Sequence, residues 1–265
     1  MASATGIPEQ PPASIDGTDE QEPLLGRPGD VSQKLNESIF TNLVTGTATV
    51  AQAGIWILAA LVWNGIFSHE LIFFSPHPVS ISSSTISTAK LTTPSLQLLN
   101  SASILLTTQA ILLLQPTHTP AQKHTGTLSH FALLALANLS FISALIIIEL
   151  NKASHPETRF RSPHAIMGLV TYILIFLQAA VGVAQYFVPR AVFGSVDRGK
   201  AVYKYHRVSG YVVLVMELAT VAAATQTDYN KVILHIPLWA VLVASVLVVG
   251  GVGARIKKQK MRVFG

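Results

Sequence analysis

Hydrophobic residues are gathered into long runs that short polar stretches separate along the 265-residue chain. A helix that crosses a membrane needs about 20 mostly apolar residues. Six runs approach or exceed that length: 46–67, 95–114, 128–149, 163–187, 205–225 and 232–254. Because the bilayer interior offers no water to backbone amides, such runs are expected to be helical. The pattern therefore predicts an all-α fold, a bundle of six transmembrane helices.

The polar stretches divide the chain into parts. Residues 1–44 are polar, Pro-rich and acidic, which is typical of a disordered tail, and 256–265 form a short basic tail. Residues 45–255 are predicted to be one six-span domain. Within it, the Ser/Thr-rich stretch 79–94 is too polar to lie against lipid in the hydrocarbon centre. We interpret it as an insertion, either genuine or an unspliced segment in the gene model.

Composition supports the membrane assignment and limits the chemistry. Half of the residues are hydrophobic, 12% are charged and the mean hydropathy is +0.47. The 18 Lys and Arg exceed the 13 Asp and Glu, and the surplus lies in short loops and in the C-terminal tail. The positive-inside rule then places both termini in the cytoplasm, facing anionic lipid rather than nucleic acid. The absence of cysteine excludes disulfides, thiolate-held clusters and covalently attached c-type haem.

Four of the nine histidines fall near the ends of the predicted spans, at two depths. His77 and His164 are expected at the non-cytoplasmic side, and His130 and His206 at the cytoplasmic side. Two imidazoles from facing helices can fill both axial positions of a haem iron, which suits electron transfer. The pattern predicts a central four-helix haem-binding core. His124, just before the third run, is the alternative to His130.

Two glycines strengthen the haem interpretation. Gly168 follows His164 by four residues, and Gly210 follows His206 by four, so each glycine shares a helix face with its histidine. A flat macrocycle would fit over such bare backbone. Small residues at this spacing also let membrane helices pack closely, so both interpretations stand.

Four short segments occur in order along the chain: "SPHPV", "LSHF", "SPHAIMGL" and "YKYHRVSGY". With them the chain resembles the eukaryotic cytochrome b561 family, of the fungal type, over roughly residues 45–255. The family consists of six-helix membrane oxidoreductases with two haems. The resemblance implies that His77 and His164 bind the non-cytoplasmic haem b, while His130 and His206 bind the cytoplasmic one.

The same resemblance implies a transmembrane oxidoreductase of the ascorbate-dependent or ferric reductase type. An ascorbate-like donor would act on the cytoplasmic side, and monodehydroascorbate or a ferric chelate would be reduced on the other. Lys123, Lys204 and Arg207 are candidates to attract the anionic donor, although each also fits an ordinary membrane anchor. A homodimer stays open. "EQEPLL", ending in Leu24–Leu25, is similar to acidic dileucine sorting signals and would suit an endosomal or vacuolar membrane.

Two other classes of protein remain as alternatives. One is a small-solute transporter whose pathway is lined by intramembrane polar residues such as Glu217, Gln178 and His164. Glu217 is costly in lipid, and it is expected either to be hydrogen-bonded in neutral form or to have a proton-linked role. The other alternative is a haem-free membrane scaffold, a family member impaired by the insertion at 79–94.

Overall fold

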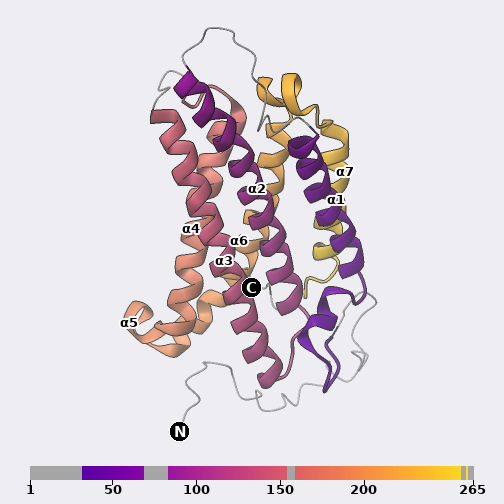
Figure 1. Cartoon of the computed structure of the whole chain (residues 1–265). Helices are drawn as coiled ribbons and strands as arrows, with labels where there is room; N and C mark the ends of the chain where they lie inside the picture. Colours follow the sequence, from indigo (N-terminus) through magenta and orange to yellow (C-terminus); the bar gives the residue numbers. More distant parts are fainter. Residues whose placement is uncertain (1–31, 69–82, 154–158, 258–260, 262–265) are drawn as a thin grey trace, which may run out of the picture.

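The computed structural model describes residues 32–68, 83–153, 159–257 and 261, with only the backbone for 83–94. Every regular element in this part of the chain is helical (Figure 1). In order, the elements are η2 (Ile39–Leu43), α1 (Ala48–Phe67), α2 (Ser83–Leu114), α3 (Pro120–Ala153), α4 (Pro163–Phe187), α5 (Pro189–Phe193), α6 (Val196–Ala224), η4 (Asn230–Leu234) and α7 (Leu238–Gly253). The predicted all-α membrane bundle is confirmed.

Five helices are long and apolar enough to cross a membrane: α1, the Ser95–Leu114 part of α2, α3, α4 and α6. The sixth predicted span is shorter than expected. Residues 230–234 form a π-helical turn, and the helix α7 begins only after Pro237. Its 16 residues extend about 24 Å at 1.5 Å per residue, less than the roughly 30 Å of hydrocarbon. The predicted start of this helix, at residue 232, is therefore wrong by six residues.

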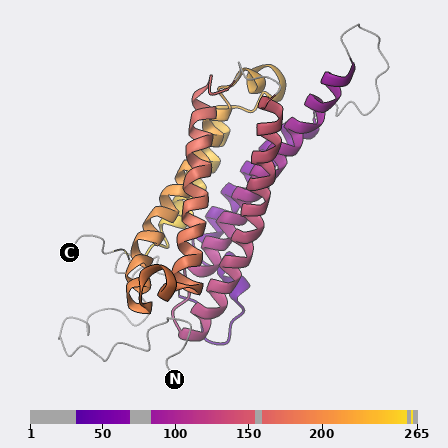
Figure 2. The ribbon, with the colours of Figure 1, turned by 90° about the vertical axis from the view of Figure 1, so that its left-hand side faces the viewer.

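The long helices pack mainly as three antiparallel pairs: α2 with α3, α4 with α6, and α1 with α7 (Figures 1 and 2). One end of the bundle holds the α2–α3 connection, α5 and the end of α7, and we call it the His206 end. The opposite end holds the start of α4, the end of α6 and η4, and we call it the His164 end. The α1–α7 pair is close because Gly54 has no side chain; a Cβ there would lie 2.6 Å from the carbonyl oxygen of Ala244.

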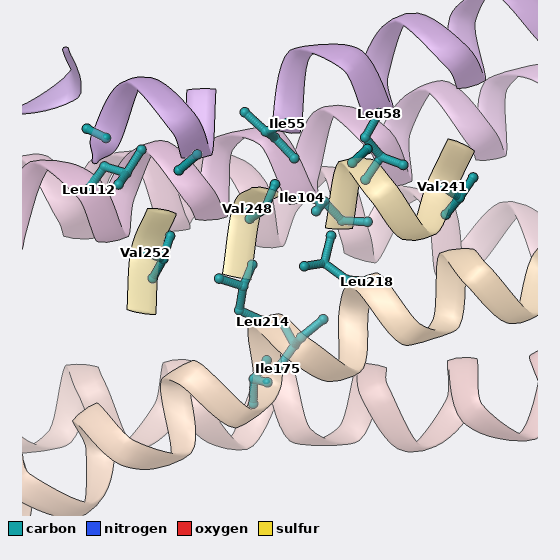
Figure 3. Packing of buried hydrophobic residues seen from close by; sticks show 14 of the residues in the cluster. Ile55, Leu58, Ile104, Leu112, Ile175, Leu214, Leu218, Val241, Val248 and Val252 are labelled. Atoms are coloured by element: carbon teal, nitrogen blue, oxygen red, sulfur yellow. The ribbon is translucent and has the colours of Figure 1, made fainter. Parts of the chain in front are cut away.

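The buried hydrophobic core is formed mainly by α1, α2, α6 and α7, with single residues from α3 and α4. Its labelled members include Ile55, Ile104, Leu214 and Val241 (Figure 3). In the most apolar window of α1, 39% of residues are buried inside the protein, but in that of α4 only 11% are. The apolar surface of α4 therefore faces lipid or a space within the bundle rather than packed side chains.

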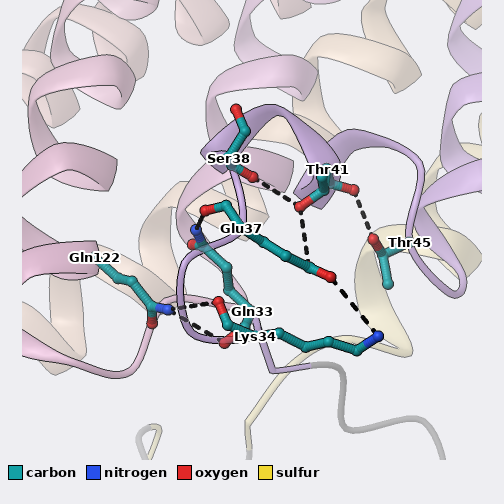
Figure 4. A network of polar contacts seen from close by, with 7 residues as sticks. All are labelled: Gln33, Lys34, Glu37, Ser38, Thr41, Thr45 and Gln122. Carbon is teal, nitrogen blue, oxygen red and sulfur yellow. Dashed lines mark hydrogen bonds and ion pairs between the residues drawn. The ribbon is translucent and has the colours of Figure 1, made fainter.

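The chain before α1 differs from the disordered tail predicted for residues 1–44. Residues 32–44 fold onto the His206 end, where Gln122 of α3 donates to the carbonyls of Gln33 and Lys34 at 3.2 and 3.1 Å (Figure 4). Asn42 is 1% exposed and donates to the carbonyl of Leu113 at 2.8 Å. The buried, hydrogen-bonded side chain of Asn42 holds residues 32–44 against the bundle. The polar composition of residues 1–44 did not indicate this contact.

The polar stretch 79–94 is described only in part. Residues 83–94 continue α2 as helix, and this extension projects beyond the neighbouring helices at the His164 end (Figure 2). Residues 79–82 lie outside the described part of the chain. Where it is described, the stretch therefore lengthens a helix at the edge of the bundle instead of entering its centre.

Candidate functional site

Two of the four predicted histidine ligands come together at the His206 end. His130 lies in α3 and His206 lies in α6, and the two imidazoles are close enough to interact electrostatically. Both residues are half-buried. The predicted proximity of His130 and His206 is thus found, whereas His124 is exposed near the start of α3.

One backbone carbonyl orients the ring of His130. Its Nδ1 lies 3.0 Å from the carbonyl oxygen of Ala110 in α2. Since a carbonyl only accepts, Nδ1 carries the proton and donates, which leaves the Nε2 lone pair available to a metal. His206 has no such partner: its Nδ1 is buried without a hydrogen bond. A buried imidazole nitrogen without a partner is an unsatisfied polar atom, so a hydrogen-bond acceptor or a metal that reached Nδ1 would stabilise it.

Glycine and glutamine from α4 pack around His206. A Cβ at Gly182 would lie 3.0 Å from Cε1 of His206. Any larger residue at position 182 would therefore require the imidazole ring of His206 to shift. One turn away, Gln178 donates from Nε2 to the carbonyl of His206 at 2.6 Å. Gly182 was not predicted from the sequence as a site residue. Its signal was weak, because one glycine in an apolar helix is ordinary in membranes.

The predicted glycine cradle is not found at Gly210. A Cβ at Gly210 would lie 2.9 Å from Nε2 of Gln178, so a side chain of this protein occupies the space expected to admit a macrocycle. This close approach agrees with the packing interpretation. Gly168 is different, because the nearest atom to a Cβ there is Cγ2 of Thr220 at 3.9 Å, and Gly168 lines a cavity.

At the His164 end, His164 stands in the first turn of α4. Ser162 caps this helix by accepting from the backbone N–H of Ala165 at 3.2 Å, and Pro163 occupies its first position. His164 Nδ1 donates to the carbonyl of Thr220 at 3.0 Å, which again leaves Nε2 free. Its predicted partner, His77, lies outside the described residues.

A cavity of about 640 Å³ opens beside His164. Its walls come from several helices and include His164, Gly168, Tyr172 and Glu217. Binding sites for cofactors and other small molecules typically occupy about 300–1,000 Å³ with mostly apolar walls. The cavity therefore has the size and lining of a cofactor site, and a free imidazole nitrogen belongs to one of the residues in its wall.

The predicted donor-attracting cations are only partly brought together. Lys123, in the first turn of α3, and Arg207, next to His206, are close enough to repel each other electrostatically. Lys204 instead holds its ammonium group 5.1 Å from the ring centroid of Tyr205, which is 51% exposed. The structure thus brings Lys123 and Arg207 near each other at the His206 end, and Lys204 lies three residues before Arg207 in α6.

Among the described residues, no cluster of three or more His, Asp or Glu could hold a metal ion. A haem does not require such a cluster, and His130 and His206 at the His206 end would be able to hold a haem. The membrane bundle, the carbonyl-oriented imidazoles and the apolar cavity together fit the class of transmembrane haem proteins.

The family comparison agrees with this class. The family model for eukaryotic cytochrome b561 matches residues 97–231, which is just over half of the chain. The chain belongs to the eukaryotic cytochrome b561 family, whose members are transmembrane oxidoreductases that use haem b for electron transfer. No curated protein and no solved structure matches the chain. The matched region contains His130, His164 and His206 but stops short of His77.

Proposed function

We propose that this protein carries single electrons across a membrane through two b-type haems. The donor is an ascorbate-like reductant in the cytoplasm, and the acceptor is monodehydroascorbate or a ferric chelate on the other side. The observation that carries the proposal is the orientation of His130 and His164. Each donates through Nδ1 to a backbone carbonyl, which leaves Nε2 as the ligating atom.

In this proposal the protein positions and insulates the haems. A bound haem supplies the one-electron carrier, and the protein supplies axial nitrogen atoms, orientation and burial. At one end, His130 and His206 are the ligands, with Gly182 leaving room for the His206 ring. At the other, His164 is a ligand, and His77 is proposed as its partner.

The side of the membrane follows from charge. The positive-inside rule favours both termini in the cytoplasm, which makes the His206 end the cytoplasmic one. Lys123 and Arg207 would then attract an anionic donor close to the haem of His130 and His206, with Lys204 at the edge of the same region. The acidic dileucine sequence at Leu24–Leu25 supports an endosomal or vacuolar location.

Spectroscopy of the purified protein tests the haem proposal. After expression with ample haem, we expect a dithionite-reduced b-type spectrum with about two haems per chain. Ascorbate should give the same reduced spectrum, and a ferric chelate added afterwards should reverse it. A protein without any haem would sink the proposal and favour the scaffold or transporter. Reduction by dithionite but not by ascorbate would keep the haems and reject the donor.

A pair of substitutions tests the donor site separately. Lys123→Gln and Arg207→Gln should each raise KM for ascorbate, because each removes one positive charge from the approach path. The dithionite-reduced spectrum should not change. Arg190→Gln, at an exposed position in α5, removes the same charge from a different helix and is the control. An equal change in KM in all three variants would mean that only the overall charge matters.

A further inference from the structure

Arg255 is an unusual residue at the His206 end. It follows α7 by two residues, and only 2% of its surface is exposed. All three of its guanidinium nitrogen atoms, Nε, Nη1 and Nη2, are closed to solvent and have no hydrogen-bond partner. The guanidinium does not cap the last carbonyls of α7; the carbonyl of Val252 instead accepts from the amide of Gln115 at 3.0 Å. Arg255 is therefore a buried cation whose donors are unused.

The surroundings of Arg255 are polar and positively charged. Gln115, at the end of α2, donates to the hydroxyl of Tyr211 at 3.1 Å, and its own Oε1 is buried without a partner. Tyr211 interacts electrostatically with both Arg207 and Arg255. The guanidinium groups of Arg207, in α6, and of Arg255, after α7, thus both lie near Tyr211.

Nothing described in the structure neutralises the charge of Arg255. The ion pairs that join Lys34, Arg159 and Lys200 to acids do not include Arg255, and its guanidinium nitrogen atoms have no hydrogen-bond partner. Burial lowers the pKa of Arg255 to about 10, so the group remains a cation at neutral pH. An unpaired buried charge is strongly destabilising, and water cannot reach these nitrogen atoms to relieve it. The site therefore requires an acceptor-rich counter-ion.

We infer that Arg255, with the hydroxyl of Tyr211 near it, binds an oxyanion between α2, α6 and α7 at the His206 end. The ligand is a carboxylate or phosphate group, because two parallel N–H donors of a guanidinium match two oxygens of such a group. This chemistry has two sources. One is a propionate of the haem held by His130 and His206, and in that case the inference rests on the proposed function. The other is a small anion from solution.

The haem-free full-length protein tests the site without the proposed function. Inorganic phosphate and citrate, added at constant ionic strength, should raise the melting temperature of the wild-type protein in a concentration-dependent way. Arg255→Gln should weaken the binding by about tenfold to a hundredfold, since it removes charge-assisted hydrogen bonds. Arg255→Lys should give an intermediate loss, because lysine keeps the charge without the fork. Arg198→Gln, at an exposed position in the first turn of α6, should bind as the wild type does.

The test is specific because the order of the two melting temperatures, wild type and Arg255→Gln, should reverse when oxyanion is added. Without added oxyanion, Arg255→Gln should melt at or above the wild-type temperature, because it removes an unpaired buried charge. With phosphate or citrate, the wild type should melt at a higher temperature than Arg255→Gln. If Arg255→Gln melts well below the wild type without oxyanion, and its deficit does not depend on oxyanion, Arg255 is only a packing residue and the inference is wrong.

The haem-loaded protein separates the two sources. If a propionate fills the site, Arg255→Gln should lower the midpoint potential of the haem at the His206 end, since a nearby cation favours the reduced form, and phosphate should no longer bind the loaded wild type. If a free anion fills it, the potential should stay unchanged and phosphate should bind both forms. No Arg255-dependent effect in either form would overturn the inference. Failure of the wild type to bind haem would instead sink the proposed function and leave the haem-free test intact.

Discussion

The two ends of the bundle present a candidate haem ligand in different ways. At the His206 end, His130 and His206 are held by close packing and by Gly182, and the neighbouring charges are positive. At the His164 end, His164 borders a cavity of about 640 Å³ whose rim carries both signs of charge, including Glu149, Arg159 and Asp228. The first site is assembled by the described helices alone. At the second, the cavity is formed by described residues, but the proposed partner of His164, His77, lies outside them.

The largest expected effect is loss of one haem in a histidine variant. With the two haems of the proposed function, His206→Ala should remove the one at the His206 end and leave the other, because the two proposed sites share no described ligand. The reduced b-type absorbance should fall by about half. His164→Ala should remove the other haem, and the two residual spectra should differ. His118→Ala, at an exposed position in the α2–α3 connection, is the control. Loss of both haems, or of neither, in His206→Ala would contradict the separation of the sites.

The next effect concerns the packing of His206. Gly182→Ala should weaken haem retention at the His206 end and spare the His164 end, because the added Cβ would lie 3.0 Å from Cε1 of His206. Haem content after gel filtration measures it. Gly250→Ala is a matched control in α7, since a Cβ there has nothing within 4 Å. Equal haem content in both variants would show that the ring of His206 moves at little cost.

The sequence predicted the helices, and the ends at which His130, His164 and His206 lie, better than it predicted how the helices pack together. Long apolar runs located α1, α3, α4 and α6, and spacing along those runs was enough to bring His130 and His206 together. The role of Gly210 was not predictable in the same way. A glycine four residues after a histidine leaves bare backbone, but whether a cofactor or Gln178 fills the gap depends on another helix.

Helix ends were also poorly determined by hydrophobicity. Polar residues extend α3 back to Pro120 and α6 back to Val196, where Ser195 caps the helix by accepting from the N–H of Arg198 at 3.1 Å. Conversely, apolar residues before Pro237 are not part of α7. Capping and proline geometry decide these boundaries locally, whereas a hydrophobic window averages over them.

A smaller effect is expected at Glu217 in the cavity beside His164. Glu217 is 3% exposed and its Oε2 is buried without a hydrogen bond. In the haem-free protein, Glu217→Leu should therefore keep or raise stability, by up to about 1–3 kcal/mol, because an unsatisfied buried polar group is removed. Chemical unfolding in detergent measures it.

The control for Glu217 is a buried polar residue that does have a partner. Thr171 and Thr220 share a hydrogen bond of 3.0 Å in the same region. Thr171→Val should lower stability by about 1 kcal/mol, opposite in sign to Glu217→Leu. If Glu217→Leu is the more destabilising of the two, the carboxyl group has a structural partner and the assignment of Oε2 as unsatisfied is wrong.

The smallest effect is expected for the ion pair at the rim of the cavity. Nη2 of Arg159 lies 2.7 Å from Oε2 of Glu149, but the side chains are 36% and 50% exposed. Water and salt screen such a pair, so Arg159→Gln should change stability by less than about 1 kcal/mol. The difference from wild type should shrink further as salt is raised. Lys200→Gln, which breaks the pair with Asp197 at 3.3 Å, is the matched control at the His206 end. A larger, salt-independent loss in Arg159→Gln alone would show that this pair holds the mouth of the cavity together, and the His164 end would then be as tightly built as the His206 end.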